Sequence, residues 1–291
     1  MNEEILMKRL GMDLYYNPAS ISNIVNIQQT LFNSDKKDII VKLKSNYICP
    51  ALFPLIFSLP YAGRLYNKNI KLTHKKINNA LSKDLILYGV DAHFQVNSMA
   101  VSKNAVVPFC YAPVLNDDVA QNISNIIENI PVNLSSEYQA AISSQIMEVF
   151  NNSYEHGHNG IGSFFTSYYE EEEKSFKFTV YDLGVGFRKP IEEYLKSSNK
   201  DINLNLWTTS DYIEWAFTKG NTTKHSDYPR GIGYDVLSNF AIENNGEILL
   251  CTNDRVCHVR KTGKEYKPLS KSILGTFFSM KINLDRTHIY K

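Results

Sequence analysis

An amphipathic helix followed directly by two strongly apolar strands is the feature that most constrains this chain. The predicted helix starts with the capping-box pattern Ser136-x-x-Gln139 and ends at Gly157. The next two segments, 162–169 and 175–182, have strand character, and we interpret the acidic turn between them as a solvated hairpin tip. An apolar helix stripe can pack on such a hairpin, so this half predicts helices layered on a sheet.

The N-terminal half alternates strand-like and helix-like segments. Residues 38–44 and 69–72 have strand character and are separated by an apolar, proline-containing segment of helical length. The alternation breaks shortly after Tyr111. We therefore predict an α/β chain with two domains, 1–115 and 116–291, which agrees with the length of the chain.

Composition excludes several classes of protein. A hydrophobic content of 43% and a charged content of 21% are ordinary for globular proteins. The formal net charge of +1 gives no reason to expect a nucleic-acid partner. The four cysteines lack the paired spacing of structural zinc sites and fit a reducing compartment. Because we find neither a signal peptide nor an apolar run of about 20 residues, we expect a cytoplasmic protein without membrane contact.

A polar seam runs along the predicted helix. Glu148, Asn152 and His156 stand four residues apart and therefore share one helical face. An Asn side-chain oxygen can complete the shell of Mg²⁺ beside phosphates and water. Taken alone, a seam that faces solvent is the simpler interpretation.

A second pattern follows the second strand of the hairpin. The apolar strand ends at Asp182, and Gly184 and Gly186 alternate after it. An ionised aspartate accepts hydrogen bonds, for example from the exocyclic amine of adenine. Glycines allow a backbone to approach a flat ring closely. A plain turn at the end of a strand is the alternative.

A third pattern lies ahead of another predicted helix. Gly231-Ile232-Gly233 opens this helix, whose free N–H groups and dipole favour an anion such as phosphate. Cationic and hydroxyl side chains in the preceding segment can add contacts to phosphate oxygens. They are Lys219, Thr222, Thr223, Lys224 and Arg230. A flexible surface loop is the alternative.

The order and spacing of these patterns resemble the ATP-binding domain of the GHKL superfamily, which includes gyrase, heat-shock chaperone, histidine kinase and mismatch-repair ATPases. Glu148–Gly157 resembles the first box of that family, Asp182–Gly186 the second and Arg230–Gly233 the third. Gly275-Thr276 resembles the start of its closing strand. The resemblance implies a C-terminal α/β two-layer sandwich, in which helices cover a mixed sheet.

The resemblance also implies cofactors, ATP and Mg²⁺, and a role for each residue. Asn152 would hold the metal, Asp182 would bond adenine, and Glu148 would be the catalytic base. Gly184 and Gly186 would line the base pocket. The remaining nucleotide-binding positions would be His156, Lys219, Thr222, Thr223, Lys224, Arg230, Gly231, Ile232, Gly233 and Thr276.

The N-terminal half resembles the small sulfate-transporter/anti-sigma-antagonist (STAS) fold in the rhythm of its strands and helices. The phosphoacceptor pair of that family is absent where Cys49–Ala51 stand, so phosphorylation in cis is not expected. An unrelated α/β sensing domain is the alternative for this half.

These patterns together predict a regulatory protein that depends on magnesium and ATP. It would hydrolyse ATP or transfer the γ-phosphoryl group to a Ser or Thr of a protein partner, as the similarity of His156-Gly157 to anti-sigma-factor-type serine kinases suggests. A non-catalytic switch that grips a partner through lid closure is the alternative, and homodimer formation stays open. A gyrase-like DNA motor is disfavoured by the near-neutral charge.

Overall fold

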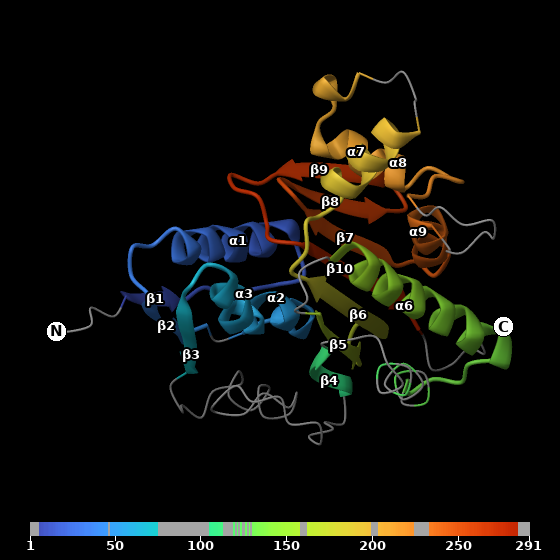
Figure 1. The fold of residues 1–291 in the computed structure, drawn as a ribbon. Coiled ribbons are helices and arrows are strands. Elements are labelled where there is room, and N and C mark those ends of the chain that lie inside the picture. Colours follow the sequence, from blue (N-terminus) through green and yellow to red (C-terminus); the bar gives the residue numbers. More distant parts are fainter. Residues whose placement is uncertain are drawn as a thin grey trace.

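Two β-sheets organise the molecule (Figure 1). The computed structural model describes residues 6–45, 47–74, 105–112, 130–157, 162–198, 203–223 and 233–284, with single positions between 119 and 128. One sheet has three strands and the other has seven, and helices pack on both faces of the larger one. The expected α/β class is therefore confirmed.

The smaller sheet is formed by the N-terminal segment. Its strands β1 (Leu6–Leu10), β2 (Asp38–Leu43) and β3 (Asn69–His74) pair in parallel in the order β1-β2-β3. Parallel neighbours need a crossover connection, and helix α1 (Pro18–Phe32) provides the first. Both predicted strands of this half are thus present, as β2 and β3.

The second crossover, expected as one helix with an irregular start, is a helix broken into short pieces. It consists of the 3-10 turn η1 (Pro50–Leu52) and the helices α2 (Phe53–Phe57) and α3 (Leu59–Leu65). Each piece has a proline in one of its first two positions, where a missing N–H costs no helical hydrogen bond. Residues 50–59 are buried, and α2 packs on the larger sheet, so this segment joins the two sheets.

The larger sheet has the strand order β4-β5-β6-β10-β7-β8-β9, and each neighbouring pair is antiparallel. Its strands are β4 (Ala105–Ala112), β5 (Ser163–Glu170), β6 (Ser175–Asp182), β7 (Glu247–Thr252), β8 (Arg255–Arg260), β9 (Gly263–Pro268) and β10 (Thr276–Asn283). The expected mixed sheet is therefore wrong for the described strands. Short turns join β5 to β6, β7 to β8 and β8 to β9, and β10 runs opposite to both of its neighbours.

The helices of this half are α6 (Ser136–Gly157), α7 (Arg188–Ser197), α8 (Thr209–Ala216) and α9 (Tyr234–Glu243). Helices α6 and α9 pack on one face of the larger sheet, and the N-terminal helices pack on the other (Figure 1). The cap of α6 lies one residue earlier than expected, because the hydroxyl of Ser135 accepts the N–H of Tyr138 at 3.2 Å. The described part of this helix reaches Gly157, and its predicted end there stays a prediction.

Two apolar cores lie on opposite faces of the larger sheet, because side chains alternate along a strand. In β10, Phe277 joins the core beneath the N-terminal helices, whereas Phe278 joins the core beneath α6 and α9. Strand β4, which ends just before the expected domain boundary at residue 115, pairs with β5 of the larger sheet. The two predicted domains thus share a sheet and a core, and the boundary itself stays a prediction.

The sequence raises expectations about both the state of the cysteines and the apolar length of the helices. All four cysteines are free thiols, with Cys110 half-buried and the other three buried, so they form no disulfide. Among the residues that the structure describes, no helix is long and apolar enough to cross a membrane.

Candidate functional site

A cavity of about 410 Å³ lies on the face of the larger sheet that α6 and α9 cover. Its walls come from α6, the loop after β6, α7, the end of α8 with the segment that follows it, the start of α9 and the sheet. The predicted site residues that line it are Glu148, Asn152, Asp182, Gly186, Lys219, Thr222, Thr223, Gly233 and Thr276. Three separate sequence patterns therefore meet in one cavity, while the roles of their residues stay predictions.

Other predicted positions are not part of this wall. Lys224, Arg230, Gly231 and Ile232 lie outside the described residues, as does the side chain of His156. Gly184 does not line the cavity, and its N–H instead donates to Oδ1 of Asp182 at 2.7 Å. Gly184 therefore shapes the surroundings of the aspartate and not the surface of the cavity.

Helix α6 brings Glu148 and Asn152 to the cavity edge. Ile146 and Phe150 are fully buried in the core beneath this helix, which fixes its rotation and turns the adjoining face toward the cavity. Glu148 is 7% exposed, and Asn152 is half-buried. A carboxylate and a carboxamide one turn apart offer oxygen atoms to a hard cation or to a polarised water.

Asp182 is a buried acceptor at the end of β6. It is 6% exposed, and the register of the sheet pairs it with Thr276 of β10, which lines the same cavity. Burial raises the pKa of Asp182 to about 7, although the backbone N–H groups of Gly184 and Thr276 favour its ionised form. The charge of this carboxyl group therefore changes near neutral pH.

Two glycines allow backbone segments to meet around Asp182. Gly275 has a φ of +76°, and a Cβ there would lie 2.0 Å from the carbonyl oxygen of Asp182. Gly186 has a φ of +73°, and a Cβ there would lie 2.8 Å from Oγ1 of Thr252. The N–H of Phe187 donates to the same oxygen at 3.0 Å, which holds the loop against the β7–β8 turn. Packing within the fold therefore requires glycine at both positions, whether or not a ligand binds.

The start of α9 gives the cavity an anion-binding character. Gly233 is the N-cap of this helix and has no side chain to accept the N–H groups of the first turn. The N–H of Val236 already donates to the carbonyl oxygen of Gly233 at 3.0 Å. The N–H groups of Tyr234 and Asp235, together with the positive end of the helix dipole, are the ones that suit an anion. Lys219, Thr222 and Thr223 line the same cavity from the segment after α8.

Sequence reasoning missed the apolar wall of the cavity. It consists of Val149, Val180, Phe187, Pro190, Ile191, Trp215, Ala216, Tyr234, Val236 and Phe278. Tyr234 is held between Phe187 and Phe217, whose ring centroids lie 4.9 Å and 5.4 Å from its own. The sequence around Trp215 is visibly aromatic, but no local pattern indicates that α8 turns toward Asp182.

The donor atoms of the cavity fit a hard divalent cation. Oxygen atoms of Glu148, Asn152 and Asp235 line it, whereas no cysteine and no described histidine does. Mg²⁺ prefers oxygen ligands and usually binds through one or two protein groups together with phosphates and water. The described residues contain no group of three His, Cys, Asp or Glu side chains that could hold a metal without such help.

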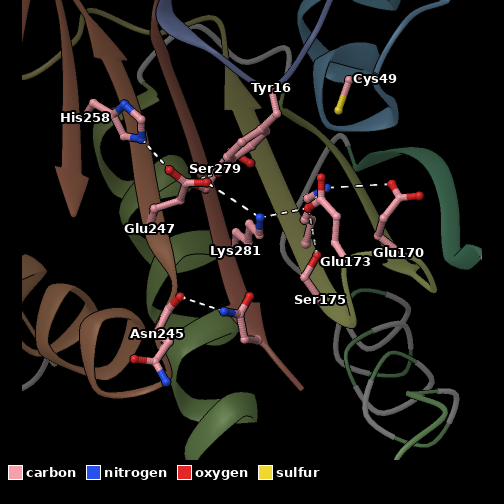
Figure 2. A network of polar contacts seen from close by, with 12 residues as sticks. Tyr16, Cys49, Glu170, Glu173, Ser175, Asn245, Glu247, His258, Ser279 and Lys281 are labelled. Atoms are coloured by element: carbon pink, nitrogen blue, oxygen red, sulfur yellow. Dashed lines mark hydrogen bonds and ion pairs between the residues drawn. The ribbon is translucent and has the colours of Figure 1, made fainter. Parts of the chain in front are cut away.

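A second polar cluster lies on the opposite face of the sheet, near the start of β6 (Figure 2). Lys177 is 3% exposed, and its Nζ lies 3.0 Å from Glu173 and 3.7 Å from Glu170. The same ammonium group lies 5.7 Å and 5.3 Å from the ring centroids of Tyr16 and Tyr168. The hairpin tip is solvated as expected, since residues 171–174 are exposed, and two of its glutamates also pair with this buried lysine.

Lys281 extends this cluster across the sheet. Figure 2 shows it between Glu173, at 2.8 Å, and Glu247, at 3.8 Å. Glu247 in turn bonds Nε2 of His258 at 2.6 Å. Since the charges of this cluster face partners within the described chain, we take the cavity as the candidate site.

Comparison with models of known protein families gives no match for this chain, and comparison with curated proteins gives none. The fold and the cavity define an α/β protein with a candidate ligand-binding site. A more specific assignment depends on the chemistry of that site and on the resemblance of its sequence.

Proposed function

We propose that the cavity binds ATP together with Mg²⁺ and that the chain regulates a protein partner. The observation that carries the proposal is Asp182, a buried carboxyl group that shares one cavity with the N-terminus of α9, where Gly233 supplies no capping side chain. An adenine amine needs such an acceptor, and phosphates need such N–H groups. A volume of about 410 Å³ lies within the usual range of small-molecule sites.

The GHKL resemblance supports the same ligand. In this interpretation α6 carries the first box, the loop after β6 the second, the start of α9 the third and β10 the closing strand. Residues of all four line one cavity, as a shared nucleotide site requires. A GHKL-type sandwich preceded by a STAS-like regulatory domain is the finer fold that we propose.

Each residue then acts through a defined group. A carboxylate oxygen of Asp182 accepts the adenine amine, and Lys219 with the first-turn N–H groups of α9 binds phosphate oxygens. Asn152 would hold Mg²⁺, which would neutralise part of the phosphate charge. The oxygen of the attacking water or hydroxyl forms a bond to the γ-phosphorus, and the bond from this phosphorus to the β–γ bridging oxygen breaks. Glu148 accepts the proton that the attacking oxygen loses.

A non-catalytic switch is the second candidate, and strand β10 favours it. Thr276 of this strand lines the cavity, while the next residue, Phe277, lies in the core shared with the N-terminal helices. A ligand that shifts β10 would therefore alter the packing of the N-terminal layer without any turnover.

Titration calorimetry tests the binding site. Asn152→Ala should lower the affinity for magnesium-ATP at least about tenfold, because a charge-assisted ligand contact is lost. The thermal unfolding midpoint should stay unchanged. Asn151→Ala is the matched control, since Asn151 is the preceding residue of α6 and does not line the cavity. Equal affinities of both variants and the parent protein would contradict the assignment.

Incubation with γ-labelled ATP and candidate partners separates the functional classes. Release of free phosphate identifies an ATPase, and label on a protein identifies a kinase. Binding without either product identifies the switch.

A further inference from the structure

Asp235 carries a carboxylate, and none of the three sequence patterns includes this residue. It is the second residue of α9, and it lines the cavity. Its side chain turns back toward the helix start. This is seen from Gly233, where an added Cβ would lie only 2.5 Å from Oδ1 of Asp235. The carboxylate thus lies beside the first-turn N–H groups, where the proposed function puts the phosphates.

The described wall of the cavity carries more negative than positive charge. Its acidic residues are Glu148, Asp182 and Asp235, and among its described residues Lys219 is the only basic one. Opposed unit charges about 4 Å apart interact strongly near a protein surface, and like charges repel equally. A phosphate at the start of α9 would therefore meet a carboxylate as well as N–H groups.

We infer that Asp235 is a specificity-determining residue that excludes metal-free nucleotide, so that the cavity accepts ATP only as its magnesium complex. The inference rests on the proposed function and specifies the form of its ligand. Without metal, the Asp235 carboxylate opposes the phosphates. With Mg²⁺, the phosphates arrive partly neutralised and the carboxylate faces a cation that prefers oxygen.

Calorimetry of Asp235→Asn tests this role, with ATP in EDTA, ATP with Mg²⁺, and adenosine as ligands. The affinity for metal-free ATP should rise at least about tenfold, because a local repulsion is removed. The affinity for adenosine should change by less than about twofold, because adenosine has no phosphate. The gain in ATP affinity on adding Mg²⁺ should shrink accordingly.

Glu243→Gln is the matched control. It removes the same charge from the last turn of α9, where the side chain is exposed and outside the cavity, and it should leave all three affinities unchanged. Asp235→Ser provides a second neutral variant, because serine also suits a first helical turn, and Asp235→Glu should keep the exclusion.

The outcomes are distinct. If magnesium-ATP binds the parent and the neutral variants, but metal-free ATP binds those variants as weakly as the parent, the inference is overturned and the proposed function stands. An equal effect of Glu243→Gln would also overturn the inference alone, since the repulsion is then not local. If the parent binds neither magnesium-ATP nor adenosine, the proposed function fails and the inference fails with it.

Discussion

The two ends of strand β6 hold carboxyl groups in opposite electrostatic states. At the cavity end, burial raises the pKa of Asp182 to about 7. Just before the other end, burial also raises the pKa of Glu173, but Lys281 and Lys177 outweigh it and lower the pKa to about 2. One carboxylate is stabilised by fixed cations of the fold, whereas the other is held by backbone N–H groups beside a cavity.

The presence or absence of a cationic partner within the described chain distinguishes two kinds of carboxyl group. Paired groups stabilise the fold, whereas we expect the group beside the cavity to bind a ligand. Charges that are paired within the chain contribute to its stability. A buried acid that meets no cation among the described residues costs stability, and such costs are typical of functional sites. We therefore expect substitutions on the paired face to change stability, and substitutions in the cavity to change binding or turnover.

The largest expected effect concerns Glu148, in the cavity. If it is the catalytic base, Glu148→Gln should lower the rate of ATP turnover roughly 10²–10⁴-fold while nucleotide affinity stays nearly unchanged, because the group acts mainly in the transition state. Steady-state assays with calorimetry measure both quantities. Glu155→Gln, at an exposed position of the same helix, is the control. A parental rate in Glu148→Gln would show that Glu148 is not the base.

The next effect concerns Tyr168, on the paired face. It is 1% exposed, lies beside Lys177 and bonds the thiol of Cys49 at 3.0 Å. Tyr168→Ala should lower the free energy of unfolding by about 3–5 kcal/mol, because it leaves a cavity in the core. Tyr168→Phe removes only the hydroxyl contact and should cost about 1 kcal/mol. Urea denaturation measures both, and a loss of nucleotide affinity in folded Tyr168→Phe would break the proposed division between faces.

Asp182 should make ligand binding depend on pH. Only its ionised form accepts the adenine amine on both oxygens, so adenosine affinity should fall up to about tenfold between pH 8 and pH 6. Adenosine is suitable because it has no group that titrates in this range. Asp182→Asn should bind weakly and without this pH dependence.

The stability of the fold should respond to Asp182 in the opposite direction. Its folded-state pKa of about 7 lies above the unfolded value, so its contribution is fully present below about pH 4 and is lost as pH rises through about 7. Relative to the parent protein, Asp182→Asn should therefore be more stable at pH 8 than at pH 6. An unchanged difference in urea denaturation would contradict the raised pKa.

The smallest effect concerns Glu173, whose side chain is 49% exposed and therefore screened by solvent. Its lowered pKa means that its contribution is present above about pH 4.3 and is lost as pH falls toward 2. Glu173→Gln should cost about 1 kcal/mol or less at pH 7, and this difference should shrink in acid. Glu172→Gln, at the exposed neighbouring position, should cost nothing measurable in the same denaturation series.

Local patterns in the sequence were sufficient for much of the fold near the cavity. The helix over 136–157 and the hairpin after it follow from periodicity, and glycines mark the close approaches around Asp182. Tyr234 and Asp235 were missed as site residues because their position depends on how α9 packs and not on its own sequence.

Contacts between distant segments could not be predicted in this way. The pairing of Lys281 with Glu173 requires β10 to lie beside β6, and sequence alone does not set that register. Similarly, the sequence of residues 50–59 does not indicate that this segment packs against the larger sheet as well as the smaller one. The shared core of the two halves is therefore a tertiary property.

Strand β10 lies at the centre of the larger sheet although it is the last of the described strands in the sequence. During synthesis, β4-β5-β6 and β7-β8-β9 emerge as two separate groups with unpaired edges until β10 enters between them. Such late, long-range pairing is slow, and open strand edges favour aggregation. Truncation before Thr276 should therefore leave two incomplete sheets that depend on chaperones, and not a smaller stable domain.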